Sequence, residues 1–480
     1  MKFKTEIVRG LKWTAGAKFA SQLVTWGITI FVMRLLAPAD YGLLAMASVF
    51  LALLGMFAEI GLGPALVQQA EASPQKLRQS FGLILLINLG LFTLLNTLAP
   101  LIALFYAEPK LTSVIRIMSL QFLLIPFIVI PEVLLQRRLD FKFRSLGEFG
   151  STVVGSIATL ILAIGGFGVW ALVIGNVAGV LFRAIFFNVV APFREWPSFS
   201  LQGMRSTLAF GGNVTGSRFL WFAFTQADTV IVGRVLGGEL LGLYSVALHL
   251  ATLPLQRVTA ILNQVAFPAF SRFQHERELV ATQLLKALSL IALVALPVFW
   301  GMSGVAPELV VVLLGPKWTE AILPMQILTL VMPFRAVVGF LPSVTDAIGR
   351  PDIGLSNAML GCIVMPIAFF VGAQWGIRGV SLAWLIVYPV VLAINMRRMV
   401  AAVGVRLRDV LLRLRPTLLC AVGMYLAIAG TRLLAKTVGG QFTALVIEIA
   451  VGGVTYIALT LLLNPGAVSD LKPMFARKPA

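Results

Sequence analysis

The sequence predicts an all-α polytopic membrane protein of about fourteen transmembrane helices, arranged as two parallel six-helix lobes around a central cavity, with two further helices after them. Three observations lead to this fold class. The 480 residues are 59% hydrophobic and only 12% charged, whereas soluble proteins carry about 25% charged residues. Long apolar runs recur along the whole chain, and a segment of the first half returns in the second.

The apolar runs are the expected transmembrane helices, because a helix needs roughly 20 apolar residues to cross a bilayer. Tight glycine-rich turns, GGFG and QWGIRG, join two of the helix pairs, and the longest connection, APFREWPSFSLQGMR, divides the chain into halves. The expected spans are 12–36, 41–68, 80–106, 112–136, 146–165, 168–190, 207–236, 240–268, 285–314, 321–345, 354–374, 379–396, 414–434 and 442–463. The expected parts are an N-terminal lobe (1–191), a cytoplasmic linker (192–206), a C-terminal lobe (207–400) and a last part with two helices and a basic tail (401–480).

The net charge of +18 could indicate binding to nucleic acid, but membrane topology explains most of it. If the N-terminus is cytoplasmic, the loops on the opposite side contain few of the 38 Lys and Arg residues, namely Lys110, Lys317, Arg378, Arg432 and Lys436. This asymmetry is the positive-inside rule. We therefore expect both termini in the cytoplasm and no nucleic-acid partner.

The two halves carry the same pattern 200 residues apart. RLLAPADYGLLAMA begins at Arg34, and RVLGGELLGLYSVA begins at Arg234. Six spans separate the copies, so the halves run in the same direction and are expected to be related by an axis along the membrane normal. Such a pair of lobes can alternate access by rocking, which favours a transporter. The aligned pairs include Gly16/Gly216, Lys18/Arg218, Thr25/Thr225, Thr29/Thr229, Arg34/Arg234, Gly42/Gly242 and Ala47/Ala247.

Polar residues in the first helix of each half are the candidate cavity lining. Their spacing places them on one helix face, with Lys18, Gln22, Thr25 and Thr29 in the first half and Arg218, Thr225 and Thr229 in the second. Lys18 and Arg218 are therefore predicted to bind an anion together. Lys18 could instead extend its side chain to the cytoplasmic interface.

Further charges lie within or beside the spans, where they must pair, reach the interface or line a wet cavity. Arg257 and Arg335 are candidate cavity cations, or partners of acids such as Asp228 and Asp346. Arg34 and Arg234 are expected to be interface anchors or parts of an outer gate.

Two carboxylates within the spans are candidates for coupling or gating. Glu59 is followed by GLGP, which favours a bend and a moving helix, and Asp228 lies within the polar stripe of the seventh span. A carboxylate placed between a low-dielectric surrounding and a nearby arginine can bind and release a proton. The alternative for Asp228 is a static ion pair with arginine.

Several kinds of chemistry have no support in the sequence. It contains no Walker A motif for ATP hydrolysis, and two His and two Cys do not form a convincing metal site. No outward loop is long enough for a catalytic domain. We therefore expect neither an enzyme nor a bound cofactor or metal.

Three segments resemble polysaccharide exporters of the Wzx type, in the multidrug/oligosaccharidyl-lipid/polysaccharide (MOP) exporter superfamily. They are RLLAPADYGLLAMASVFLALLGMFAEIGLGPALVQ, LLQRRLDFKFRS and QADTVIVGRVLGGELLGLYSVALHLATLPLQRVTAILNQVAFPAFSR. The resemblance extends over almost the whole chain, and ADTVIVGRVLG followed by LGLYSVA is its most specific part.

The resemblance implies a flippase that moves undecaprenyl-diphosphate-linked oligosaccharide units across the bacterial inner membrane for exopolysaccharide, capsule or O-antigen synthesis. It also implies coupling to H⁺, to another cation gradient or to membrane potential. Membrane lipids and polysaccharide polymerase or assembly proteins are the further expected partners. Three alternatives stay open: a lipid II flippase, a multidrug or cation antiporter, and a scaffold of a glycan-assembly complex that transports nothing.

Overall fold

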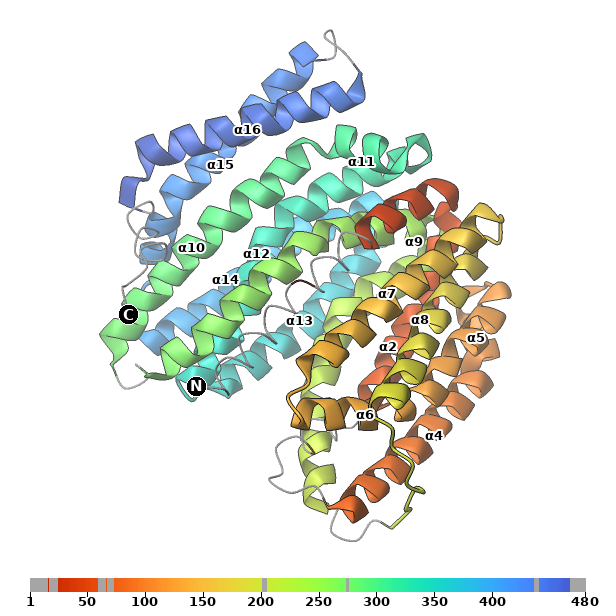
Figure 1. The fold of residues 1–480 in the computed structure, drawn as a ribbon. Coiled ribbons are helices and arrows are strands. Elements are labelled where there is room, and N and C mark those ends of the chain that lie inside the picture. Colours follow the sequence, from red (N-terminus) through yellow and green to blue (C-terminus); the bar gives the residue numbers. More distant parts are fainter. Residues whose placement is uncertain are drawn as a thin grey trace. The chain divides into compact units, whose positions relative to one another are not determined.

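In a computed structural model of the protein, all the regular secondary structure is helical in the part of the chain that the structure describes (Figure 1). That part comprises residues 16, 25–58, 66, 73–200, 205–272, 276–435 and 440–466, without the side chains of 205–221, 256–269, 271–272, 277 and 433–435. Eleven of its segments are long and apolar enough to cross a membrane. Two of them, Lys110–Arg137 and Pro351–Val403, each contain two α-helices. The expected spans 12–36 and 207–236 lie partly among residues or side chains outside the description.

The chain forms two compact units, Met1–Gly242 and Leu243–Ala480, and each is described here by itself. The predicted boundary at the linker 192–206 stays a prediction. The first unit contains the short helix Thr25–Leu35 and the first part of a long helical segment, α9 (Arg205–Arg272). Its other helices are α2 (Pro38–Ala58), α4 (Pro74–Tyr106), α5 (Lys110–Leu124), α6 (Pro126–Arg137), α7 (Phe141–Ile164) and α8 (Val169–Val190).

Local sequence signals set several helix ends in this unit. The Ser73 hydroxyl accepts a hydrogen bond from the Lys76 amide, and Pro74 follows at the first helical position of α4. The Asp140 carboxylate accepts from the Phe143 amide in the same way and begins α7. The predicted GGFG turn is confirmed, because α7 ends at Ile164 and α8 begins at Val169.

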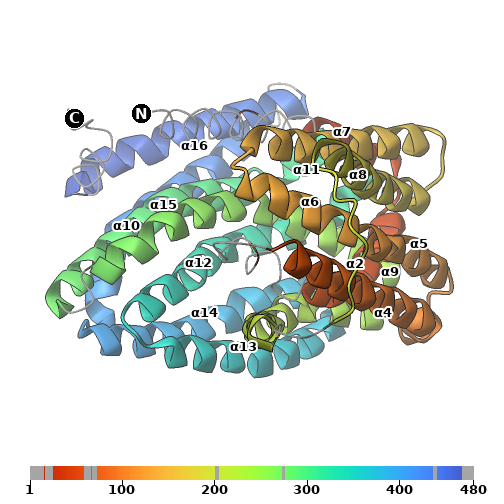
Figure 2. The ribbon, with the colours of Figure 1, turned by 60° about the horizontal axis from the view of Figure 1, so that its bottom comes forward.

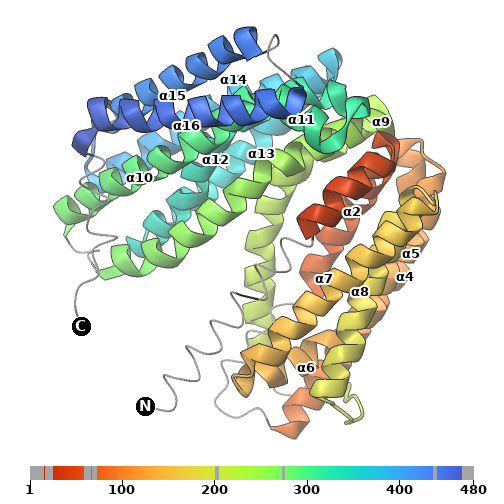
Figure 3. The ribbon, with the colours of Figure 1, turned by 45° about the horizontal axis from the view of Figure 1, so that its top comes forward.

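Helices α7 and α8 lie side by side and pack through glycines (Figures 1 and 3). A Cβ atom built on Gly179 would lie 2.8 Å from the Ser151 carbonyl oxygen, and one on Gly175 would lie 2.9 Å from the Gly155 carbonyl oxygen. Both distances are too short for any side chain. The segment GNVAG at 175–179 therefore allows close packing of the two helices, as small residues do in membrane proteins.

The repeated motif is a point of contact within the first unit. The α9 segment has a break at Gly237 (φ 84°), a conformation that favours glycine, and the helix continues from Gly238. A Cβ atom on Gly42 would collide with the backbone of Gly238, and one on Gly242 would collide with the backbone of Pro38. Because Pro38 and Gly238 are themselves 200 residues apart, the two copies of the motif contact each other reciprocally.

The second unit is built from the end of α9 and the remaining helices. The predicted turn at QWGIRG corresponds to η2 (Ala373–Trp375), where a Cβ atom on Gly372 would lie 2.6 Å from the Gly379 carbonyl oxygen. The other elements are α10 (Arg277–Gly304), α11 (Ala306–Leu314), η1 (Pro316–Ala321), α12 (Ile322–Ala347), α13 (Pro351–Gly372), α14 (Gly376–Val403), α15 (Leu407–Ala435) and α16 (Gln441–Leu463).

The last two helices pack on α10 through an apolar cluster (Figure 2). Leu296 from α10, Met424 and Ile428 from α15, and Leu445 from α16 are all buried in this cluster. The α15–α16 pair, which follows the twelfth expected span, is therefore packed onto the second unit through α10.

Candidate functional site

A pocket of about 340 Å³ opens in the first unit among the helix Thr25–Leu35, α2, α7 and α8. None of the residues that line it is charged. Seven of them carry neutral polar side chains, namely Thr29, Tyr41, Ser151, Thr152, Ser156, Thr159 and Asn176. The pocket can therefore exchange hydrogen bonds with a polar, uncharged ligand inside an otherwise apolar helical unit.

The polar face of α7 forms one wall of this pocket. Thr152, Ser156 and Thr159 follow one another at spacings of four and three residues, so they share a helix face. The Thr152 hydroxyl donates to the Glu148 carbonyl oxygen (3.0 Å) and the Thr159 hydroxyl donates to the Gly155 carbonyl oxygen (2.9 Å). With their protons used in this way, both hydroxyl oxygens keep lone pairs that can accept from a ligand.

Asn176 on α8 supplies both donors and an acceptor to the opposite wall. Its side chain is exposed and lines the pocket, and it makes no hydrogen bond to another residue that the structure describes. The glycine packing of α7 against α8 keeps the two walls close. Gly175 and Gly179, which line the pocket beside Asn176, approach the backbone of Gly155 and Ser151.

Sequence reasoning found one element of this pocket and missed the others. Thr29, the last residue of the predicted polar stripe on the first helix, lines the pocket. The stripe on α7 was not predicted, although STVVGSIAT repeats polar residues at the same helical spacing. The same test of spacing, applied to the fifth span, could have identified it.

Arg335 in α12 is a cation without a described acidic partner. Its guanidinium carbon lies 4.6 Å from the centre of the Trp384 ring, and Trp384 is held by a hydrogen bond from its indole nitrogen to the Tyr244 hydroxyl (3.0 Å). The Arg335 Nη1 atom is buried without a hydrogen-bond partner, and no ion pair joins Arg335 to Asp346 among the residues described. The stacked ring fixes the guanidinium and leaves a donor free for an anion.

The other predicted charges have different surroundings. Asp228 is fully buried, and its carboxylate accepts hydrogen bonds from the amide (2.7 Å) and the hydroxyl (3.3 Å) of Thr229. Arg34 and Arg234 are exposed, and the Arg234 guanidinium lies 5.4 Å from the Phe105 ring centre. Their roles in coupling, gating or anchoring stay predictions.

Four predicted site residues, or their side chains, lie outside the part of the chain that the structure describes. Lys18 and Glu59 lie outside the described residues, and so do the side chains of Arg218 and Arg257 within α9. The predicted pairing of Lys18 with Arg218 around an anion therefore stays a prediction as well.

Two ion-pair clusters were not predicted as such. In the first unit Glu132 contacts Arg183 (2.6 Å) and Arg144 (3.0 Å). In the second unit Arg432 contacts Glu308 (3.0 Å) and Glu448 (3.6 Å). Glu132, Arg183 and Glu448 lie within the expected spans 112–136, 168–190 and 442–463, but no periodicity indicates their partners.

A family profile described as "Polysaccharide biosynthesis protein" matches residues 31–323, which is more than half of the chain. The chain belongs to this family. This polysaccharide biosynthesis protein is 26% identical over 491 residues to the succinoglycan biosynthesis transport protein ExoT of Rhizobium meliloti, covering 98% of this chain and 96% of that one. It is also 26% identical over 401 residues to the teichuronic acid biosynthesis protein TuaB of Bacillus subtilis (81% and 80% covered). The lipopolysaccharide biosynthesis protein WzxC of Escherichia coli is 26% identical over 398 residues (81% and 79% covered).

Solved structures show that the family member has the MOP-type fold. The lipid II flippase MurJ, in an inward closed conformation, has a TM-score of 0.75 at 16% identity, with 95% of this chain and 99% of that chain covered. An inward-facing MATE multidrug transporter of the MOP superfamily has a TM-score of 0.62 at 14% identity, with 80% and 95% covered. The predicted family resemblance and fold class are confirmed.

Proposed function

We propose that this protein flips undecaprenyl-diphosphate-linked oligosaccharide units from the inner to the outer leaflet of the bacterial inner membrane, for the synthesis of a surface polysaccharide. It does so by alternating access, with both termini in the cytoplasm, and it is a transporter and not an enzyme. The names of its relatives support this role, since ExoT is a succinoglycan biosynthesis transport protein, WzxC a lipopolysaccharide biosynthesis protein and TuaB a teichuronic acid biosynthesis protein.

The neutral polar pocket of the first unit is the observation that carries the proposal. An oligosaccharide presents many hydroxyl groups and needs donors and acceptors to replace water. Thr152, Thr159 and Asn176 offer such groups on facing helices. The lipid tail needs no polar lining, because it is apolar and can stay in the hydrocarbon core of the bilayer.

In the second unit, considered by itself, Arg335 offers a donor suited to the anionic part of a lipid-linked substrate. A diphosphate loses its hydration when it enters a protein of low dielectric, and a guanidinium can replace part of it by charge-assisted hydrogen bonds. The buried Nη1 atom of Arg335 supplies such a donor.

The alternatives differ in what they require of these two sites. A multidrug antiporter for cationic drugs would need a carboxylate in its pocket, and none of the lining residues carries one. A lipid II flippase would also need an arginine for the diphosphate, so Arg335 does not separate the two lipid-linked substrates. A scaffold that transports nothing would need neither site.

The test is export in cells that lack their own exporter and carry this protein. Asn176→Leu removes the donors and the acceptor of α8, and Thr159→Val removes a hydroxyl while it keeps the side-chain shape. Each lost hydrogen bond of about 1 kcal/mol should lower the flipping rate about fivefold. Lipid-linked oligosaccharide should then accumulate on the cytoplasmic leaflet, and surface polysaccharide should fall.

Thr93→Val on α4 is the matched control. Thr93 bonds the Leu89 carbonyl oxygen (2.9 Å) as Thr159 bonds that of Gly155, but it is not among the residues lining the pocket. Normal export by the control and by both pocket variants, at equal membrane levels, would show that the pocket does not bind the transported sugar. No export by the wild type in these cells would support the scaffold. Accumulation of lipid II in place of the oligosaccharide would support the lipid II flippase.

A further inference from the structure

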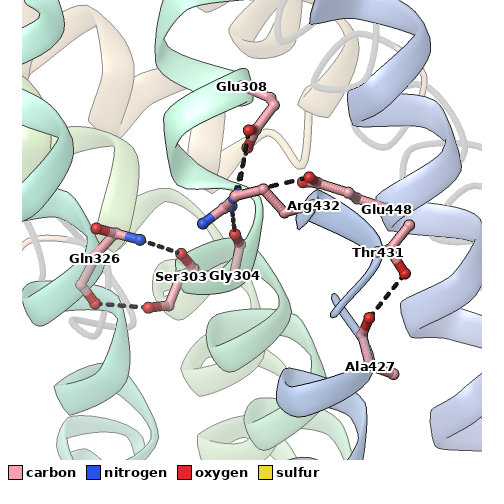
Figure 4. A network of polar contacts seen from close by, with 8 residues as sticks. All are labelled: Ser303, Gly304, Glu308, Gln326, Ala427, Thr431, Arg432 and Glu448. Atoms are coloured by element: carbon pink, nitrogen blue, oxygen red, sulfur yellow. Dashed lines mark hydrogen bonds and ion pairs between the residues drawn. The ribbon is translucent and has the colours of Figure 1, made fainter. Parts of the chain in front are cut away.

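Three charged side chains from three different helices meet in the second unit (Figure 4). Arg432 at the end of α15 contacts Glu308 of α11 through two nitrogens, with Nη2–Oε2 at 3.0 Å and Nε–Oε1 at 3.2 Å. The same Nε atom lies 3.6 Å from Oε1 of Glu448 in α16. The Nη2 group also donates to the Gly304 carbonyl oxygen at the end of α10.

The cluster is shielded from water. The side chains of Glu448, Glu308 and Arg432 are 0%, 12% and 23% exposed. Neither carboxylate oxygen of Glu448 has a hydrogen-bond partner among the described residues, although an ionised carboxylate accepts several. An ionised Glu448 would therefore be a buried anion with a single long contact to a cation.

The charges do not balance. One arginine faces two glutamates, and its two-pronged contact is with Glu308. Among the residues that the structure describes, no second cation makes an ion pair with this cluster. Helix α10 contributes a carbonyl oxygen, and the Gln326 amide of α12 donates to the backbone of Ser303. The Thr431 hydroxyl donates to Ala427, and Lys317 and Glu320 of the adjoining η1 are exposed. With both glutamates ionised, the cluster would carry one uncompensated negative charge.

We propose that Glu308, Arg432 and Glu448 form a proton-binding site, in which Glu448 carries the proton while Glu308 stays ionised against Arg432, and that this proton is the coupling ion of the transport. The second half of this inference rests on the proposed function. A metal cation fits less well, because it would have to sit beside a guanidinium, and hard cations require six or more oxygen ligands, or ordered waters in their place.

The proton state of Glu448 controls how three helices are held together. When Glu448 is neutral, Arg432 can keep its two bonds to Glu308 and thus join α15 to α11. When Glu448 loses its proton, it competes for the same Nε atom and draws Arg432 towards α16. Proton binding thereby favours one arrangement of α11, α15 and α16 over another, as a coupling site requires.

The first test observes the proton without any transport. Infrared difference spectra of the purified full-length protein, recorded between low and high pH, should contain the carbonyl stretch of a protonated carboxyl group. Glu448→Gln should remove it. Glu308→Gln should remove it too, since Arg432 then balances an ionised Glu448. The exposed-residue control Glu320→Gln should keep it.

Two spectroscopic outcomes would overturn the site. If no protonated carboxyl band is lost in Glu448→Gln, Glu448 does not change its protonation state between the two pH values and is not the proton carrier. If the band persists in Glu308→Gln, Glu448 is protonated for reasons of burial alone and the three groups do not share one proton.

The second test measures coupling in cells that export polysaccharide through this protein. Collapse of the pH gradient by a potassium/proton exchanger should lower export by the wild type about tenfold or more. Glu448→Gln resembles a site that always carries its proton. The export that remains in this variant should therefore not respond to the exchanger. Replacement of sodium by choline should have no effect, and a sodium dependence that disappears in Glu448→Gln would overturn the assignment to protons.

The two proposals fail in different ways. If Asn176→Leu stops export while Glu448→Gln keeps the wild-type response to the pH gradient, the flippase function stands and the coupling role is wrong. If the infrared band behaves as expected but the wild type restores no export in cells that lack their own exporter, the proton site stands and the flippase function is wrong.

Discussion

Arg335 illustrates how much a single residue depends on neighbours that are distant in sequence. The sequence identifies it as a cation within a span, and this follows from hydropathy alone. Its contact with Trp384 and the hydrogen bond from Trp384 to Tyr244 depend on how α9, α12 and α14 pack, which no local pattern encodes. Charges within the spans are thus predictable from sequence, whereas their partners are not.

The anion-binding role of Arg335 leads to a prediction on charge and geometry. Arg335→Gln should reduce export about 10- to 100-fold, the range expected when a hydrogen bond to a charged group worth about 1.5–3 kcal/mol is lost. Arg335→Lys should recover only part of the loss, because an ammonium group keeps the charge but not the planar stacking on Trp384. The measurement is the amount of surface polysaccharide per copy of membrane-inserted protein.

Leu382→Ala is a suitable comparison for Arg335→Gln. Leu382 is an exposed apolar residue on the same helix as Trp384, and its loss should leave export unchanged. If Arg335→Gln exports as well as this control does, the Arg335 guanidinium is structural and the diphosphate is bound elsewhere.

At the scale of helices, the tight turns were easier to predict than the breaks. GGFG and QWGIRG mark the ends of helices because glycine adopts positive φ values there, as Gly168 (φ 56°) and Gly376 (φ 68°) do. The break between α5 and α6, before Pro126, and the break between α10 and α11 at Val305 were not predicted. Apolar residues continue through both breaks, so the hydropathy pattern is unchanged across them.

The glycine packing of α7 against α8 can be tested by its stability. Gly179→Val would place a branched side chain where a Cβ atom lies 2.8 Å from the Ser151 carbonyl oxygen. Overpacking of this kind costs about 1–3 kcal/mol and would separate the two walls of the pocket. We expect a lower Tm in detergent and weaker export from the same variant.

Gly90→Ala in α4 distinguishes this packing from a general cost of losing a glycine. A Cβ atom on Gly90 has nothing within 4 Å, so alanine there should leave Tm unchanged or raise it slightly. If Tm fell by the same amount in both variants, the packing at Gly179 would be no tighter than the packing at Gly90.

At the scale of the whole molecule, the repeat and the composition predicted the fold class, because both are properties of long segments. Errors of a few residues in single spans do not change them. The lobe boundary was placed at the long connection 192–206, while the compact units of the structure divide after Gly242, beyond the repeated motif. A boundary placed at a long connection and a boundary between compact units follow from different criteria, and only the first can be predicted from a sequence.

Topology is the prediction that belongs to this scale. The positive-inside rule places the Arg138 turn in the cytoplasm and the Glu108 turn outside. In a protein with Cys362 and Cys420 replaced by Ser, Glu108→Cys should react with a membrane-impermeant maleimide in intact cells. Arg138→Cys should react only after the inner membrane is opened. The opposite pattern would reverse the orientation of the entire chain.

The reciprocal contact between Gly42 and Gly242 has a consequence for how the sequence can change over time. Each glycine lies against the backbone of the other copy of the motif, at Gly238 and Pro38 respectively. A backbone offers no side chain that could shrink to compensate for a larger neighbour. A side chain at either glycine would therefore push the two copies of the motif apart. The two positions thus share one steric constraint, and a substitution that Gly42 cannot accept is excluded at Gly242 for the same reason.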